Sequence, residues 1–302
     1  LLASISVVVF YKINKLFFSE KISLFGSLLF SLFPLHVYAC AQISSITLYI
    51  FLVIFFYYYF FQIAKKENLK SIVIFSFTAG LLILTRHEFI GILLLSSLFL
   101  FLFFNTSKKN ILLIILIALM TTSPYLIRNI LIFEKIIIQA GFGYNVWKAN
   151  NPNSKVEGSG FIDNDLQKKI DKIPKDKFYR INEDKIFLKE GVKYIMEEPR
   201  RYLMLYLQKV ISFLFIDINS SETHYYNPFH YIPVLLLGLT SLLGILVSDK
   251  KSYKINYLIL TFFFYIIIFS FFAILPRYKL MVIPLQIIFT NILIDYIKKR
   301  IS

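Results

Sequence analysis

Three arginines stand where long apolar runs of the sequence end. Arg86 lies in a short turn between two such runs, Arg128 follows a run that contains Pro124, and Arg277 follows Pro276 at the end of another run. A guanidinium binds two phosphate oxygens side by side and stays charged at any pH, and an ionisable group at a membrane edge is costly to keep. These residues, with Lys279, therefore predict a site for a phosphate group. The alternative is that they are interfacial anchors whose charged ends reach into water.

The stretch between residues 141 and 152 is rich in glycine, asparagine and aromatic residues. Glycine lets the backbone approach a ligand closely, asparagine donates and accepts hydrogen bonds, and an aromatic ring offers a flat face to a sugar. This composition favours a sugar-binding loop, although an ordinary turn has the same composition. The candidates for binding a sugar or an acceptor are His87, Asn129, Tyr144, Asn145, Trp147, Asn150, Asn151 and Tyr278. Asn129 has the alternative role of capping a helix end.

The composition is that of a polytopic membrane protein. Of the 302 residues, 57% are hydrophobic and 17% are charged, and a soluble core cannot use apolar runs that are this long and frequent. The net charge of +15 would suit nucleic acid, but the cations lie in short clusters between apolar runs, which argues against that partner. Cys40 is the single cysteine, so no intrachain disulfide can form.

The sequence assigns no cofactor. It contains no phosphate-binding glycine loop, zinc-protease motif or serine-hydrolase motif. Glu222, His224 and His230 match no recognised spacing of metal ligands, so no metal site is assigned and the need for a divalent metal is left open.

Nine apolar runs are candidates for membrane helices. They cover residues 1–11, 22–39, 43–63, 69–84, 89–104, 111–127, 231–247, 253–275 and 280–297. Pro34 is expected to kink the second run. The first run is about half of the ~20 residues that a crossing needs, so we expect the chain to be a fragment that begins inside a helix.

Charge alternates between the loops that join these runs. Lysine-rich clusters mark every second loop, at residues 12–21, 65–70, 108–109, 250–254 and 298–300. The positive-inside rule makes these loops cytoplasmic. The intervening loops, which hold Arg86, Arg128 and Arg277, are then expected on the outer face.

The long polar segment after the sixth run divides the chain. We predict an all-α polytopic membrane protein with an extracytoplasmic loop region between spans: residues 1–132 form the first part of a transmembrane bundle, 133–228 the loop region, and 229–302 the last transmembrane helices. The run 202–215 begins after two arginines and includes Lys209. A full crossing there would invert every later loop, so we expect a helix that lies at the membrane interface.

Six segments in this order resemble a known family. They are SLFPLHVYACAQ (31–42), AGLLILTRHEF (79–89), SPYLIRNILIF (123–133), GFGYN with NNP (141–152), EEPRRYLMLYLQK (197–209) and LPRYKLMVIP (275–284). The chain resembles the membrane glycosyltransferases of the GT-C fold, in the branch that includes protein O-mannosyltransferases and the lipid A aminoarabinose transferase.

This resemblance implies a reaction. A sugar would pass from a polyprenyl-phosphate donor to a lipid, glycan or protein acceptor on the outer face, with inversion at the anomeric carbon, in a multi-pass protein of the bacterial inner membrane. The family's catalytic base is an acidic residue of the first outer loop, which is expected upstream of Leu1. Where the family often has a second Glu, this chain has Ser45, Ile46 and Thr47. Glu88 is the remaining acidic candidate and is not assigned as the base.

Two other functions fit part of the pattern. A lipid-linked sugar translocase or polysaccharide exporter would also present arginines to a phosphate, but it should line its spans with polar residues, and these spans carry few. A scaffold protein would not need three arginines on the outer face.

Overall fold

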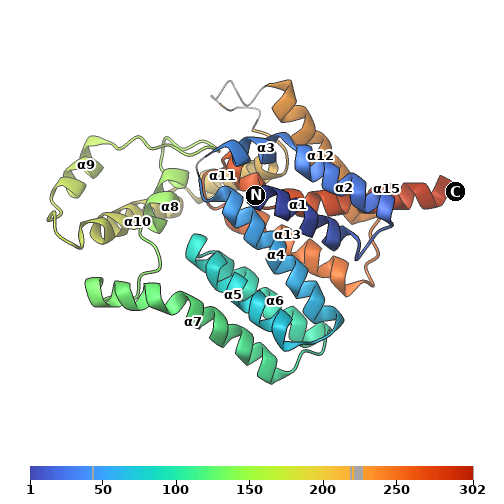
Figure 1. The fold of residues 1–302 in the computed structure, drawn as a ribbon. Helices are drawn as coiled ribbons and strands as arrows, with labels where there is room; N and C mark the ends of the chain where they lie inside the picture. Colours follow the sequence, from blue (N-terminus) through green and yellow to red (C-terminus); the bar gives the residue numbers. More distant parts are fainter. Residues whose placement is uncertain (43, 218–219, 221–226, 302) are drawn as a thin grey trace. The chain divides into compact units, whose positions relative to one another are not determined.

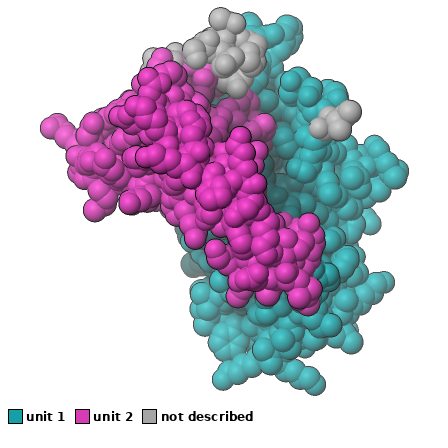
Figure 2. All heavy atoms as spheres, turned by 90° about the vertical axis from the view of Figure 1, so that its left-hand side faces the viewer, with its two compact units in different colours: residues 1–124, 226–265, 279–302 teal, residues 125–225, 266–278 magenta. Residues whose placement is uncertain are grey.

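The computed structural model describes residues 1–42, 44–217, 220 and 227–301 (Figure 1). Every regular element in this part of the chain is a helix, which confirms the predicted all-α class. The chain forms two compact units, coloured separately in Figure 2. Unit 1 comprises Leu1–Pro124, Tyr226–Tyr265 and Lys279–Ser302, and unit 2 comprises Tyr125–Tyr225 and Ile266–Tyr278.

Unit 1 contains most of the apolar helices. They are α1 (Leu2–Asn14), α2 (Glu20–Leu32), α3 (Pro34–Ala41), α4 (Ile46–Lys65), α5 (Leu69–Thr85), α6 (Phe89–Phe103), α12 (Pro228–Leu246) and α15 (Ile283–Ile301). Three further helices continue across the boundary between the units: α7 (Lys108–Phe133), α13 (Tyr253–Phe269) and α14 (Pro276–Lys279). Helices α4, α5 and α6 pack against one another (Figure 1).

Among the described residues, three helices are long and apolar enough to cross a membrane: α4, α7 and α12. The pair α2 and α3 makes a fourth candidate span, bent by 49° at its break. Pro34 begins α3, and Phe33 before it is extended, because the proline ring disfavours a helical residue in front of it. The kink predicted at Pro34 is therefore confirmed. Helices α1, α5, α6 and α13 are apolar but shorter.

Helix α15 lies in the interior of unit 1, where all residues from Ile283 to Ile292 are buried. Helix α12 approaches it closely at Gly244, where an added Cβ would stand 1.8 Å from the carbonyl oxygen of Phe289. Thr240 and Thr290 share a hydrogen bond of 2.9 Å between the same helices. Small residues and pairs of hydroxyl groups of this kind hold helices together in membranes. Apolar side chains contribute little there, because lipid tails surround them as favourably as another helix does.

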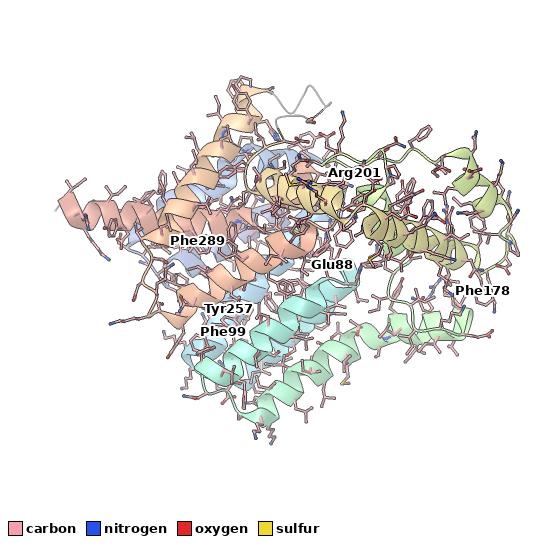
Figure 3. The ribbon with its side chains drawn as sticks, turned by 180° about the vertical axis from the view of Figure 1, so that it is seen from behind. Glu88, Phe99, Phe178, Arg201, Tyr257 and Phe289 are labelled. Carbon is pink, nitrogen blue, oxygen red and sulfur yellow. The ribbon has the colours of Figure 1, made fainter. Side chains whose placement is uncertain are left out.

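Aromatic rings fill the rest of this interior. The rings of Phe60 and Tyr257 stack at 3.7 Å, and Phe99 lies 5.5 Å from Tyr257 (Figure 3). Tyr257 directs its hydroxyl to Ser96, at 2.7 Å. These rings join helices α4, α6 and α13. The one polar atom among them, the hydroxyl of Tyr257, has a hydrogen-bond partner.

Unit 2 is built from shorter and more polar helices: α8 (Phe142–Asn150), α9 (Asn164–Asp171), α10 (Tyr179–Glu197) and α11 (Pro199–Leu214). Its core cluster contains Trp147, Leu166, Ile170, Ile173 and Phe187. Two glycines let α8 and α10 meet: a Cβ on Gly143 would stand 2.0 Å from the carbonyl oxygen of Asp184, and one on Gly191 would stand 2.9 Å from Trp147 Cα.

The helix boundaries differ from the sequence prediction at two points that concern the site. Helix α7 continues through Pro124 to Phe133, so Arg128 and Asn129 lie within it and not after it. A proline inside a membrane helix is tolerated when neighbouring groups satisfy the freed carbonyl. The predicted loop between residues 141 and 152 is largely the helix α8, because Gly143, Trp147 and Asn150 fall on one helical face and pack inward.

Candidate functional site

The turn between α5 and α6 holds Arg86, His87 and Glu88 in unit 1. Arg86 ends α5 with an extended backbone, and its N–H donates to the carbonyl of Leu82 at 2.7 Å. Its guanidinium carbon lies 5.5 Å from the centre of the Tyr49 ring. A cation over an aromatic face in a poorly solvated place is held by the ring's negative face. The turn is thereby tied to α4.

Glu88 stands at the start of α6 (Figure 3). Its Oε2 lies 3.8 Å from Nδ1 of His87. The same oxygen is buried and makes no hydrogen bond with any residue that the structure describes. A buried acceptor without a donor costs about 1–3 kcal/mol. This carboxylate oxygen is therefore suited to accept a hydrogen bond from a hydroxyl that enters the site.

A pair of tyrosines supports this turn through Arg86. Tyr49 and Tyr265 bring their hydroxyls within 3.3 Å of each other, and both rings are buried. Since Arg86 lies against the Tyr49 ring, the pair links the position of the guanidinium to α13. The sequence analysis did not single out either tyrosine, because their contact joins residues 216 positions apart in the chain.

Arg128 is exposed on α7 in unit 2. One of its five N–H donors, on Nη1, reaches Asn129 Oδ1 at 2.9 Å. Asn129 is buried and donates from Nδ2 to the carbonyl of Ile137 at 2.7 Å. Asn129 thus joins the end of α7 to the following loop and orients Arg128, while its predicted contact with a ligand stays a prediction.

Arg277 lies in the short helix α14, directly after Pro276. It is exposed, and its guanidinium carbon lies 5.4 Å from the centre of the Tyr278 ring. The Tyr278 ring in turn lies 5.8 Å from Phe269. Lys279, the next residue, is 6% exposed and belongs to unit 1.

The residues predicted to bind a sugar differ in the solvent exposure of their side chains. Trp147 is 1% exposed and packs against Phe187 at 4.8 Å, so its flat face serves the core of unit 2. Asn150 and Asn151 are buried, and Nδ2 of Asn151 donates to the carbonyl of Ser159 at 2.7 Å. The structure gives these three residues packing and hydrogen-bonding roles, and their contact with a sugar stays a prediction.

Two members of the predicted sugar site reach the surface. Asn145 is exposed and Tyr144 is half-buried. The backbone N–H of Tyr144 donates to Asp184 Oδ1 at 2.9 Å, which fixes the first turn of α8 against α10. A sugar that approaches α8 would therefore meet Tyr144 and Asn145 before any other residue of the predicted set.

Sequence reasoning missed the role of Lys209. Its side chain is 1% exposed, and Nζ donates to the carbonyl of Ala149 at 2.8 Å and to Asn150 Oδ1 at 3.3 Å. Burial lowers the pKa of this amine from its ordinary 10.5 to about 7. The available signal was a lysine among apolar residues on the amphipathic run 202–215.

The described residues contain no group of three or more His, Cys, Asp or Glu side chains that could hold an ion. Of the three residues examined in the sequence for metal binding, Glu222 and His224 lie outside the described residues and His230 lies in α12.

The comparisons with known proteins concern the first part of the chain. Residues 1–127 match the family model described as dolichyl-phosphate-mannose-protein mannosyltransferase. These 127 residues are similar to membrane glycosyltransferases of the GT-C kind. This confirms the resemblance seen in the sequence. No curated protein and no solved structure matched the chain.

The family match covers only some of the candidate site residues. Arg86, His87 and Glu88 lie inside the matched region, which ends one residue before Arg128. Arg128, Arg277 and the candidate residues of α8 lie beyond the matched region, so their assignment rests on the sequence and on the geometry of unit 2 alone.

Proposed function

We propose that this glycosyltransferase moves a sugar from a polyprenyl-phosphate donor to an acceptor hydroxyl on the outer face of the membrane, with inversion at the anomeric carbon. The observation that carries the proposal is the turn 86–88 in the matched region, which holds the guanidinium of Arg86 and, two residues later, a buried carboxylate oxygen that accepts no hydrogen bond from a described residue. The alternation of lysine-rich loops supports the outer face.

The reaction forms one bond and breaks another. The acceptor oxygen attacks the anomeric carbon and gives its proton to a general base, and the bond from that carbon to the phosphate oxygen breaks with its electron pair going to the phosphate. The products are the glycosylated acceptor and the polyprenyl phosphate. The general base is an acidic residue of the first outer loop, as the family resemblance implies.

The cations act on the leaving group. Negative charge grows on the phosphate as the sugar departs, and fixed guanidinium groups stabilise that charge without having to reorganise. Arg86, Arg128, Arg277 and Lys279 are proposed to hold the phosphate. Glu88 is proposed to accept a hydrogen bond from a hydroxyl of the sugar or the acceptor through its buried Oε2.

The test uses the full-length protein in liposomes with radiolabelled polyprenyl-phosphate sugars. Alanine at Arg86, Arg128 or Arg277 should reduce transfer at least about a hundredfold if each neutralises transition-state charge, while Arg300→Ala, at the far end of α15, should transfer at the wild-type rate. Wild-type turnover in all three variants would refute the phosphate site. Movement of the labelled lipid across the bilayer without transfer would instead support a translocase.

A further inference from the structure

Helix α11 has two unlike faces. Leu203, Leu207 and Ile211 are exposed along one side. On the other side Lys209 and Phe213 are buried, each at 1% exposure. An amphipathic helix normally keeps its charges on the exposed face. A lysine on the buried face of α11 therefore needs an explanation.

A polar route leads from Lys209 to the segment 266–278. Lys209 Nζ donates to the carbonyl of Ala149 and to Asn150 Oδ1 at the C-terminal end of α8, where carbonyls lack helical partners. Asn150 Nδ2 donates in turn to the carbonyl of Val146 at 2.9 Å and to that of Phe271 at 3.1 Å. One asparagine side chain thus links α11 and α8 to the segment that holds Arg277.

An aromatic route runs beside the polar one. Phe213 on α11 stacks on Phe269 at 6.2 Å, and Phe269 contacts Tyr278 at 5.8 Å. The guanidinium of Arg277 lies over the Tyr278 ring. Rings in contact transmit position well because packed interiors deform little. This route reaches Arg277 from the same helix as the polar route.

Two further contacts hold the segment 266–278. Tyr206 on α11 donates from its hydroxyl to the carbonyl of Ile267 at 3.1 Å. The backbone N–H of Ile274 donates to the carbonyl of Val156 at 2.9 Å, in the connection between α8 and α9. The segment is therefore fixed at both ends by backbone carbonyls or amides, with the Asn150 contact between them.

We propose that Lys209 is a positioning residue, which through Asn150 fixes the segment 266–278 and with it the orientation of Arg277. The proposal rests on the proposed role of Arg277 in holding the donor phosphate. Lys209 touches no reacting atom. It acts by keeping the side chain of Asn150 in the rotamer that reaches Phe271.

The hydrogen bonds made by the side chain at position 209 explain why a lysine stands there and not an apolar residue. Removing one partner of a buried hydrogen bond leaves the other partner unsatisfied, which costs about 1–3 kcal/mol. A methionine would fill the same space on α11 but could not donate to Asn150, whose Oδ1 would then lack a donor from that helix. The burial that lowers the pKa of Lys209 leaves an amine that still donates in its neutral form.

The experiment reads the segment directly, without relying on activity. In full-length protein with Cys40→Ser, and with any cysteine outside the 302 residues also replaced by serine, Arg277→Cys carries a nitroxide spin label in nanodiscs. Lys209→Met should narrow the EPR spectrum of this label, since the segment gains motion. Gln208→Met changes the exposed neighbour on the same helix and should leave the spectrum as in the parent. Equal spectra for Lys209→Met and the parent would overturn the proposal.

Two other variants keep the proposal testable if Lys209→Met does not fold. Asn150→Leu removes the acceptor for Lys209 and the donor to Phe271 while keeping the volume, and it should free the label as Lys209→Met does. Lys209→Gln can still donate to one acceptor and should restore part of the immobilisation. If neither variant moves the spectrum in the expected direction, the relay through Asn150 is wrong.

Kinetics separate this proposal from the proposed function. With Arg277 present, Lys209→Met should lower kcat/KM by roughly tenfold to a hundredfold, as a misplaced catalytic contact does. In an Arg277→Ala background the same change should have no further effect. An equal loss in both backgrounds would overturn the positioning role. A freed label together with wild-type turnover in Arg277→Ala would refute the function of Arg277 and leave the positioning intact.

Discussion

The side-chain amide of Asn291 on α15 donates to Asn14 Oδ1 on α1, at 2.9 Å. Both side chains are fully buried, and Asn14 also donates from Nδ2 to the carbonyl of Phe10 at 2.9 Å. Helix α2 reaches the same place through Gly26, where an added Cβ would stand 2.2 Å from Asn291 Nδ2. Three helices of unit 1 therefore meet at one polar contact, and the glycine makes room for it.

Gly26→Ala should destabilise unit 1, because the new Cβ would overlap an amide that has to keep its partner. We expect a loss of about 1–3 kcal/mol, the usual result of adding a methyl group to a packed core. Thermal unfolding of the purified protein in detergent measures it. Gly160→Ala is the matched control, since its Cβ would meet only the Tyr144 hydroxyl, at 3.6 Å. Equal midpoints for the two variants would contradict the model of the junction.

Asn14→Leu and Asn291→Leu should each lower the midpoint of unfolding, because the remaining amide is left without its partner. We expect about 0.6–2 kcal/mol for each, the range measured for hydrogen bonds between membrane helices. The double variant should lose less than the sum, since no amide is then left unsatisfied. A double-mutant cycle with additive losses would show that the two side chains do not interact.

Lys209 predicts a pH dependence of stability. Its pKa is about 7 in the folded unit against an ordinary 10.5. Between these values the unfolded chain binds a proton that the folded chain does not, so the free energy of unfolding should rise as pH increases through this window. Lys209→Met should flatten that rise, and Gln208→Met should keep it. The check is the unfolding midpoint at several pH values from about 7 upward; a midpoint that falls over the window would contradict the buried amine.

Glu88→Gln tests the buried carboxylate oxygen of the turn 86–88. The change keeps the shape of the side chain and removes the charge, so a hydroxyl that donates to Oε2 would lose a charge-assisted hydrogen bond worth about 1.5–3 kcal/mol. We expect kcat/KM to fall by roughly tenfold or more, measured with labelled donor in liposomes. Glu197→Gln, on the exposed face of α10, is the control. Unchanged kinetics in both variants would remove Glu88 from the site.

The sequence by itself determined the all-helical class, the resemblance of the first part of the chain to a glycosyltransferase family and the main apolar helices. It also determined the break at Pro34, because a proline restricts its neighbour wherever it stands. The amphipathic run 202–215 correctly indicated the helix α11. These features follow from local rules of hydrophobic period and backbone geometry, which need no knowledge of the partner surface.

Only the tertiary structure decided which of the candidate side chains are buried and which are exposed. Trp147 and Asn150 suggested a loop that binds a sugar, but the packing of α10 against α8 buries both residues. The sequence placed Lys209 on a helix at the membrane interface without a partner, and the structure gives its amine two oxygen acceptors at the end of α8. Burial and hydrogen-bond partners come from residues tens of positions away in the chain, so no local pattern encodes them.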